Sequence, residues 1–199
     1  MLSPFDQFKF NIDRVGNLIA IYDVLNRQTT TALDVTDILR AAFVLAVSAF
    51  DFCVHEVVRT QMLEVHKGTR QATSSFRRFR ISMESLQAAL ASPNDHEWLD
   101  NEIRIQHSWK SFQHPDNVAD AVRLVSDASF WDRVAASIGQ DPLSTKRQLG
   151  LIVDRRNKIA HEADMDPTTP GDRWPIDSAL VQESVEFLKL IVGAMQTLL

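Results

Sequence analysis

The chain has 199 residues, a hydrophobic fraction of 45% and a formal net charge of −5, which is enough apolar material to fill the core of one ordinary domain. Cys53 is the only cysteine, so an internal disulfide and a multi-cysteine zinc site are excluded. The acidic balance argues against a general nucleic-acid coat protein, although it says little about a local basic surface. We expect a single domain over residues 1–199.

Apolar spacing predicts two long helices at the start of the chain. Apolar residues recur every three or four positions from Phe5 to about Leu25, which is the period of an amphipathic helix. A second helix is expected to begin at the cap Asp34 and to end at Gly68. Its apolar run, 41–50, is too short for a bilayer and predicts a buried helix. The N-terminal segment lacks the features of a secretory signal, so we expect a cytoplasmic protein with no membrane span.

Shorter helices are predicted for the middle of the chain. Asn94 and Glu97 resemble a capping box, Pro115 is expected to end that region, and Gly139 is a helix stop. Asp127 is expected to cap the last of these helices. The ranges expected to be helical are 80–90, 94–112, 117–125 and 128–138.

Two more long helices are predicted for the last third. Asp141 and Pro142 are cap and first-turn residues for a helix that continues to about Ala163. Residues 167–175 are rich in Pro and Gly and predict a loop, after which the final helix begins at Asp177. Strand signals are weak and no repeat is visible. The expected fold class is all-α, an up-and-down bundle of long antiparallel helices with short inserted helices.

One arginine interrupts the apolar stripe of the helix expected over 142–163. Arg156 stands four residues after Ile152 and four before Ala160. A guanidinium keeps its proton and is costly to bury unpaired, so Arg156 needs an acidic partner, a subunit interface or a ligand phosphate. Asn157 and His161 are four apart and share a face, which would let the amide orient the imidazole.

Structural roles remain open for these residues. Arg156 could form a buried salt bridge with Asp51 or Glu56, and His161 could be a helix-end histidine that interacts with the helix dipole. Asp51 and His55 form a polar lane with Ser48 in an otherwise apolar helix. For this lane we favour a structural network over a catalytic role.

The motif R-N-x-x-A-H, here Arg156, Asn157 and His161, resembles the R-x4-H motif of HEPN (higher eukaryotes and prokaryotes nucleotide-binding) domains. Upstream, AAFVLAVSAFDFCVHEVV resembles the second helix of the RiboL-PSP-HEPN branch, in which an Asp and then a His followed by an acidic residue recur. In this chain these are residues 51, 55 and 56. With the helix order, the likeness spans most of the chain.

The resemblance implies RNA cleavage without a metal or other cofactor, usually in a dimer. His161 would act as general base on a ribose 2′-OH, and Arg156 would stabilise the phosphoryl charge, with Asn157 as the third site residue. Asp51, His55 and Glu56 are supporting candidates. No metal site is predicted, because clustered ligand spacing is lacking. Residues five apart on a helix point about 140° from each other, so a two-fold pair of motif helices, and hence a homodimer, is expected.

We therefore expect a ribonuclease of the toxin or phage-defence kind, with RNA as substrate and an antitoxin protein as a further partner. The alternative is a non-catalytic HEPN module that binds RNA or a protein. A purely structural helical protein is a third class, and it predicts monomers without affinity for nucleic acid.

A basic stretch adds candidate RNA contacts. No acidic residue occurs from Val65 to Met83, where basic residues surround Phe76 and Phe79, a pattern that suits a phosphate backbone and a stacked base. A solvated loop whose phenylalanines return to the core is equally open. The candidate RNA-binding residues are Lys67, Arg70, Arg77, Arg78 and Arg80, together with Arg155 and Lys158 beside the motif, which could instead pair with Asp154 and Glu162. Core or loop-anchoring roles are expected for Trp98, Trp109, Trp131 and Trp174.

Overall fold

The computed structural model of the chain describes residues 2–30, 33–92 and 95–199. Within these ranges the chain is helical, with an isolated bridge between Met165 and Arg173 and no β-strand. The fold class is therefore all-α, as predicted. The elements are α1 (Pro4–Gln28), α2 (Asp37–His66), the 3-10 helix η1 (Phe76–Arg78), α3 (Met83–Ala91), α4 (Glu97–His107), α5 (Pro115–Arg123), α6 (Phe130–Ile138), α7 (Pro142–Glu162) and α8 (Ser178–Leu198).

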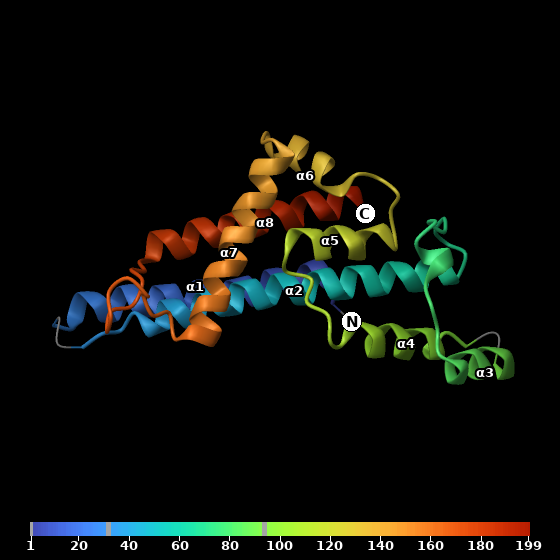
Figure 1. Cartoon of the computed structure of the whole chain (residues 1–199), viewed down its shortest axis with the longest axis horizontal. Helices are drawn as coiled ribbons and strands as arrows, with labels where there is room; N and C mark the ends of the chain where they lie inside the picture. The colour runs from blue at the N-terminus through green and yellow to red at the C-terminus, as the bar shows by residue number, and fades with distance from the viewer. Residues whose placement is uncertain (1, 31–32, 93–94) are drawn as a thin grey trace.

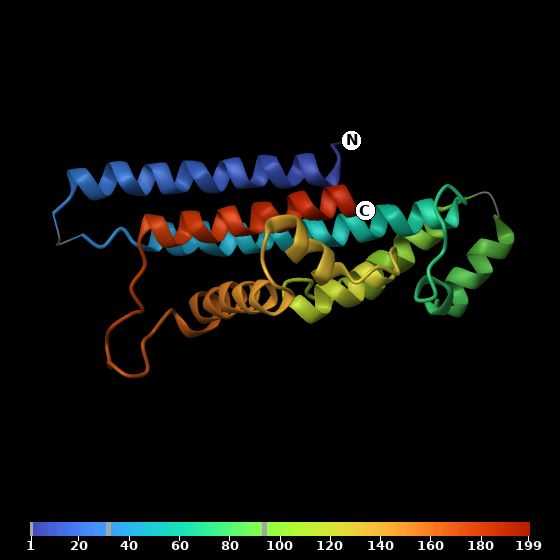
Figure 2. The same cartoon turned by 90° about the horizontal axis from the view of Figure 1, so that it is seen from above.

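The long helices form the body of the molecule. α1 and α2 run antiparallel along each other, and α8 packs against both (Figure 1). Helix α7 crosses α2 obliquely on the side opposite α1, and α5 lies on that same side (Figure 2). One cluster of buried apolar side chains draws on α1, α2, α4, α5, α6, α7 and α8, so the motif helix α7 is fixed by the shared core.

Helix α2 is the centre of this core. It is the one helix in the described part of the chain that is long and apolar enough to cross a bilayer, by length and composition alone. In its most apolar window, 56% of the residues are buried inside the bundle. Phe43, Phe50 and Met62 are almost completely covered by the neighbouring helices. The apolar run is thus used for packing.

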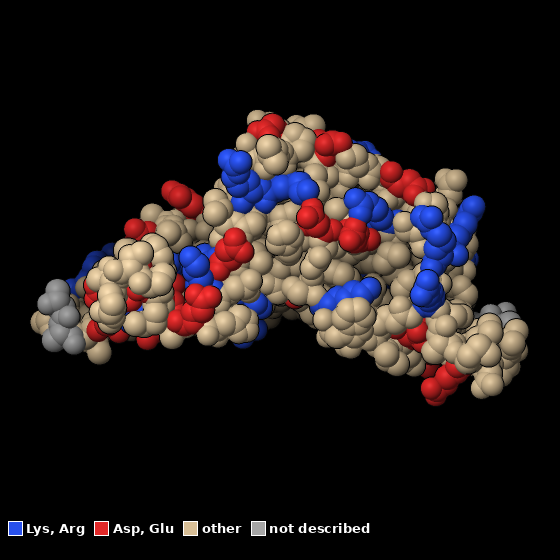
Figure 3. Space-filling model, viewed as in Figure 1, with Lys and Arg blue, Asp and Glu red and all other residues tan. Residues whose placement is uncertain are grey.

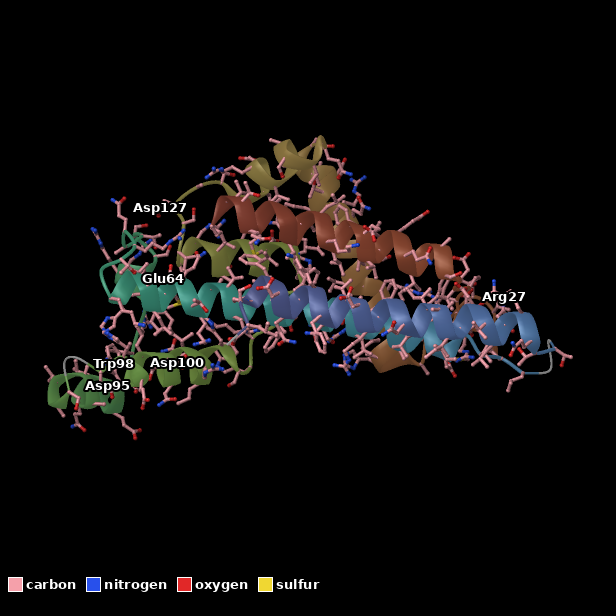
Figure 4. The ribbon with its side chains drawn as sticks, turned by 180° about the vertical axis from the view of Figure 1, so that it is seen from behind. Arg27, Glu64, Asp95, Trp98, Asp100 and Asp127 are labelled. Carbon is pink, nitrogen blue, oxygen red and sulfur yellow. The ribbon has the colours of Figure 1, made fainter. Side chains whose placement is uncertain are left out.

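Helix α4 lies along the C-terminal half of α2 (Figure 4). Arg59 of α2 reaches Asp100 of α4, with Nη1 2.8 Å from Oδ1, and also pairs with Glu56 at 2.8 Å. This contact holds the first turn of α4 against α2. α3, which precedes α4 in the chain, lies at the right-hand end of the molecule in Figure 1.

Several predicted boundaries were wrong, for local reasons. The helix expected to reach Phe112 ends at His107, because the backbone N–H of Phe112 donates to the Asp51 carboxylate at 2.6 Å and so leaves the helical path. Pro115 begins α5 instead of only ending the previous region, since a helix needs no N–H from its first residue. Asn94, the predicted cap of α4, lies outside the described residues.

Two predicted caps lie slightly too early. Asp34 does not cap α2 itself; its carboxylate accepts the N–H of Thr36 at 2.9 Å and forms the turn before the helix. Likewise α6 begins after Ser129 and not after Asp127. Before α6 the turn is made by Ser126, whose hydroxyl accepts the N–H of Ala128 at 3.3 Å.

Candidate functional site

The C-terminal end of α7 has an unusual backbone. Two consecutive non-glycine residues, Ala163 and Asp164, have left-handed φ values of 52° and 61°, a conformation that L-residues rarely adopt. Their N–H groups return to the Lys158 carbonyl, that of Asp164 at 3.0 Å. This is the capping turn of a helix end. It turns the chain back beneath the last two turns of α7, where the motif lies.

The turn brings Asp164 into a buried ion cluster. Its side chain is fully buried, and its Oδ2 lies 2.8 Å from Nε of Arg40 and 2.8 Å from Nη2 of Arg155. Arg155 also donates to the carbonyls of Trp174 and Pro175, at 3.2 and 3.1 Å. Burial lowers the pKa of Arg155, whereas the Asp164 charge opposes that shift. The cluster joins α7, α2 and the loop 165–175.

Arg155 is therefore neither a free RNA contact nor the partner of Asp154 or Glu162, as the sequence suggested. Its side chain is only 17% exposed, and its charge is balanced inside the bundle. The prediction failed because it considered helical neighbours only, whereas the actual partner follows the left-handed turn.

Arg156 has a different environment from its neighbour. Its side chain is half-buried, its Nη1 donates to Oδ1 of Asn157 at 3.0 Å, and its Nε is buried without a hydrogen-bond partner. No ion pair of Arg156 occurs within residues 2–30, 33–92 and 95–199. The structural alternative, a salt bridge to Asp51 or Glu56, is not what the structure shows. A half-buried positive charge thus remains without a counter-ion among the described residues.

His161 and Asn157 are not joined as expected. His161 is exposed in the last turn of α7. The Asn157 amide contacts Arg156, and in the described part of the chain no hydrogen bond connects it to His161. The three motif residues therefore share one helix end, but a single chain does not bring the guanidinium and the imidazole together on one face.

The supporting candidates Asp51, His55 and Glu56 face the α4 side. Asp51 accepts from the backbone N–H of Phe112 and, at 3.0 Å, from Gln113. His55 lies 3.6 Å from Asp51 and stacks on Phe112 with a centroid distance of 4.2 Å; burial lowers its pKa. The carboxylate of residue 56 contacts Arg59. Asp51 and His55 thus contact each other and the loop after α4, whereas no side-chain hydrogen bond of Ser48, the third residue of the predicted polar lane, occurs among the described residues.

The basic side chains of this stretch are of two kinds: one is hydrogen-bonded inside the fold, and the others are exposed. Arg70 donates to the carbonyls of Val125 and Leu199, at 3.3 and 2.7 Å, and so ties the segment to the C-terminus. It was predicted to bind RNA, but its donors are used inside the fold. The other predicted contacts of the stretch, Lys67, Arg77, Arg78 and Arg80, are exposed, and none has an ion pair among the described residues. Figure 3 shows Lys and Arg side chains gathered at this end of the molecule.

The remaining predicted residues, the aromatic ones and Lys158, differ in burial and contacts. Phe76 and Phe79 are partly buried against the core, as the solvated-loop alternative expected. The Lys158 ammonium lies 5.0 Å from the ring centroid of Trp174. Trp131 is buried and donates to the Pro115 carbonyl at 2.8 Å. Trp109 is 77% exposed, so a core role for it is wrong.

Sequence reasoning missed two features. The first is the pairing of Arg40 with Asp164, which are far apart in the chain and carry no spacing signal. The second is a cleft of about 630 Å³ that contains His107 and Trp109. Its walls come from three separate segments of the chain, and the sequence contained no signal that brings them together.

Comparison with known proteins gives one match. The family model described as RiboL-PSP-HEPN matches residues 9–199. No curated protein and no solved structure matches the chain.

Proposed function

The chain belongs to the RiboL-PSP-HEPN family, and on this premise we propose that it is a metal-independent endoribonuclease of the toxin or phage-defence kind. RNA is the proposed substrate. Arg156, Asn157 and His161 at the end of α7 are the proposed catalytic residues. The cytoplasm, where the RNA is present, is the proposed location.

One observation carries this proposal. Arg156 is half-buried and has no counter-ion in the described part of the chain, although the neighbouring Arg155 has a fully buried carboxylate as its partner. An unpaired guanidinium in such surroundings destabilises the fold unless an external anion completes it. A phosphodiester has the charge and the planar oxygen pairs that a guanidinium binds.

These groups support transfer of a phosphoryl group within the RNA strand, from O5′ of the next nucleotide to the ribose O2′. His161 removes the proton from a ribose 2′-OH, and the O2′ attacks the adjacent phosphorus while the P–O5′ bond breaks. Arg156 stabilises the charge that gathers on the non-bridging oxygens. The products are a 2′,3′-cyclic phosphate and a 5′-hydroxyl end, whose oxygen takes up a proton.

A homodimer is proposed to complete the site. Arg156 and His161 point about 140° apart on a straight helix, so one α7 does not present both to one phosphate. A two-fold pair of α7 helices would place the arginine of one subunit opposite the histidine of the other. An antitoxin protein is the further partner that a toxin of this kind would need.

The experiment uses a short RNA with a single ribose at the cleaved nucleotide and its all-deoxy counterpart, both in EDTA. The proposal predicts cleavage of the first strand only, with a cyclic phosphate at the new 3′ end. Cleavage of the all-deoxy strand, or activity that EDTA abolishes, would overturn it.

The second candidate is a non-catalytic HEPN module that binds RNA or a protein partner. The separation of Arg156 from His161 in the single chain favours this reading, because the two groups do not form an assembled site there. Expression separates the two functions. An active toxin slows the growth of its host and the Arg156→Ala/His161→Ala variant does not, whereas a binding module gives equal growth for both.

A further inference from the structure

A concave surface lies away from the α7 motif. The cleft of about 630 Å³ is formed by the end of α4, the loop 108–114, α5 and the segment around η1, and none of its lining residues belongs to α7. Helix α5, which forms one wall, lies on the side of α2 opposite α1 (Figure 2). Its volume is within the range typical of small-ligand sites.

His107 in the wall of this cleft has an unused polar atom. The side chain is 3% exposed, and its Nε2 is buried with no hydrogen-bond partner among residues 2–30, 33–92 and 95–199. The ring packs edge-on against Phe112 and Phe79, with centroid distances of 5.1 and 6.3 Å. Burial lowers its pKa to about 4, so the imidazole is neutral at physiological pH and has one donor and one acceptor nitrogen. A buried polar atom of this kind normally has a partner.

The rim of the cleft is cationic. Arg78, Arg80 and Lys110 line it, and none of the three has an ion pair in the described part of the chain. The acidic residue of the wall, Asp120, is already paired with Arg123. The surface therefore attracts an anion.

An aromatic face completes the site. Trp109 lines the cleft and is 77% exposed, with the Lys110 ammonium 5.3 Å from its ring centroid. Large exposed aromatic rings beside cations are the platforms on which proteins stack unpaired bases.

We propose that this cleft binds one unpaired nucleotide, with the base against Trp109 and hydrogen-bonded by His107, and the phosphate at Arg78, Arg80 and Lys110. The inference rests on the proposed function in one respect, that RNA is the natural source of the nucleotide. The cleft would then hold the strand at a distance from the motif and select single-stranded RNA.

The test measures binding without cleavage. Fluorescein-labelled penta-adenylate and penta-uridylate RNAs are titrated in EDTA into the full chain carrying His161→Ala, and anisotropy gives Kd. Trp109→Ala should weaken binding by about tenfold or more, the loss expected for one base–aromatic stack. Arg78→Glu/Arg80→Glu should weaken it further and reduce the dependence of log K on log salt.

Matched controls are available elsewhere on the surface. Leu143→Ala removes a side chain that is 68% exposed, and Arg14→Glu reverses an exposed charge on α1; neither should change Kd. His107→Phe keeps the aromatic packing and should weaken binding several-fold. Because Trp109 and Leu143 are both exposed, neither variant depends on the fold tolerating a core change.

The outcomes distinguish the ligand sources. If AMP or UMP displaces the pentamers at concentrations close to the pentamers' own Kd, the ligand is a free nucleotide. If the pentamers bind and the mononucleotides do not displace them, the ligand is the RNA strand. Absence of binding by both, or a Trp109→Ala variant equal to Leu143→Ala, would overturn the inference. Failure of the nuclease proposal would leave these binding curves unchanged, since they are measured without cleavage.

Discussion

The Arg155 guanidinium lies 2.8 Å from the fully buried carboxylate of Asp164, which follows the end of the same helix. Arg155 and Arg156 are adjacent in the sequence, yet among the described residues an anionic partner is found for Arg155 alone. The fold thus uses one arginine of the pair and leaves the other without an ion partner in the described chain.

This difference predicts that alanine substitution of the two arginines lowers stability by unequal amounts. Arg155→Ala should lower the free energy of unfolding by about 1–3 kcal/mol, because Asp164 keeps only Arg40 as its partner. Asp164→Ala leaves the two arginines facing each other and should cost roughly 3–5 kcal/mol. Arg156→Ala should cost less than about 1 kcal/mol. Urea denaturation measures all three, and equal losses for the Arg155 and Arg156 variants would contradict the assignment.

His107 predicts a dependence of stability on pH. Burial lowers its pKa from 6.5 to about 4, so between these values the unfolded chain is protonated and the folded chain is not. The unfolded state then binds more protons, and the free energy of unfolding falls as the pH decreases from about 6.5 to about 4. The loss of unfolding free energy due to His107 approaches roughly 3 kcal/mol near pH 4 and is absent well above pH 6.5.

Denaturation curves at pH 7.5, 6 and 5 measure this effect. His107→Phe should show a shallower fall than the parent chain. Some fall should persist, because burial also lowers the pKa of His55 and His66. Parallel curves for the two proteins would show that His107 is not the group responsible.

The proposed dimer predicts complementation between two inactive variants. Arg156→Ala and His161→Ala chains are mixed, unfolded and refolded together so that subunits exchange. If each site takes its arginine from one subunit and its histidine from the other, half of the dimers regain one of two sites, and about a quarter of the parental activity returns. A mixture as inactive as its components would mean that each site draws both groups from one chain.

The sequence was sufficient where the signals are local. Asp141 accepts from the N–H of Ser144 at 2.9 Å and Pro142 occupies the first turn, so α7 and the position of its motif were predicted within one residue. Asp177 caps α8 in the same way. Apolar periodicity likewise located α1 and the core helix α2.

The partners of the charged residues could not be predicted. Asp164 reaches Arg155 only because Ala163 and Asp164 adopt left-handed backbone conformations. Neither residue is a glycine or an asparagine, the residue types from which such a helix end is predicted. The cleft at His107 depends on where α4 ends, and that end is set by the distant Asp51. Such contacts arise from tertiary packing, which local spacing does not encode.

The most direct test of the central claim is the initial rate of RNA cleavage in EDTA for the parent chain and four alanine variants, purified to the same chromatographic peak. Arg156→Ala and His161→Ala should each reduce the rate by about 100-fold or more. Two matched controls should retain the parental rate. They are Arg147→Ala, at an exposed arginine of α7, and His114→Ala, at an exposed histidine. Parental rates for the Arg156 and His161 variants would contradict the account.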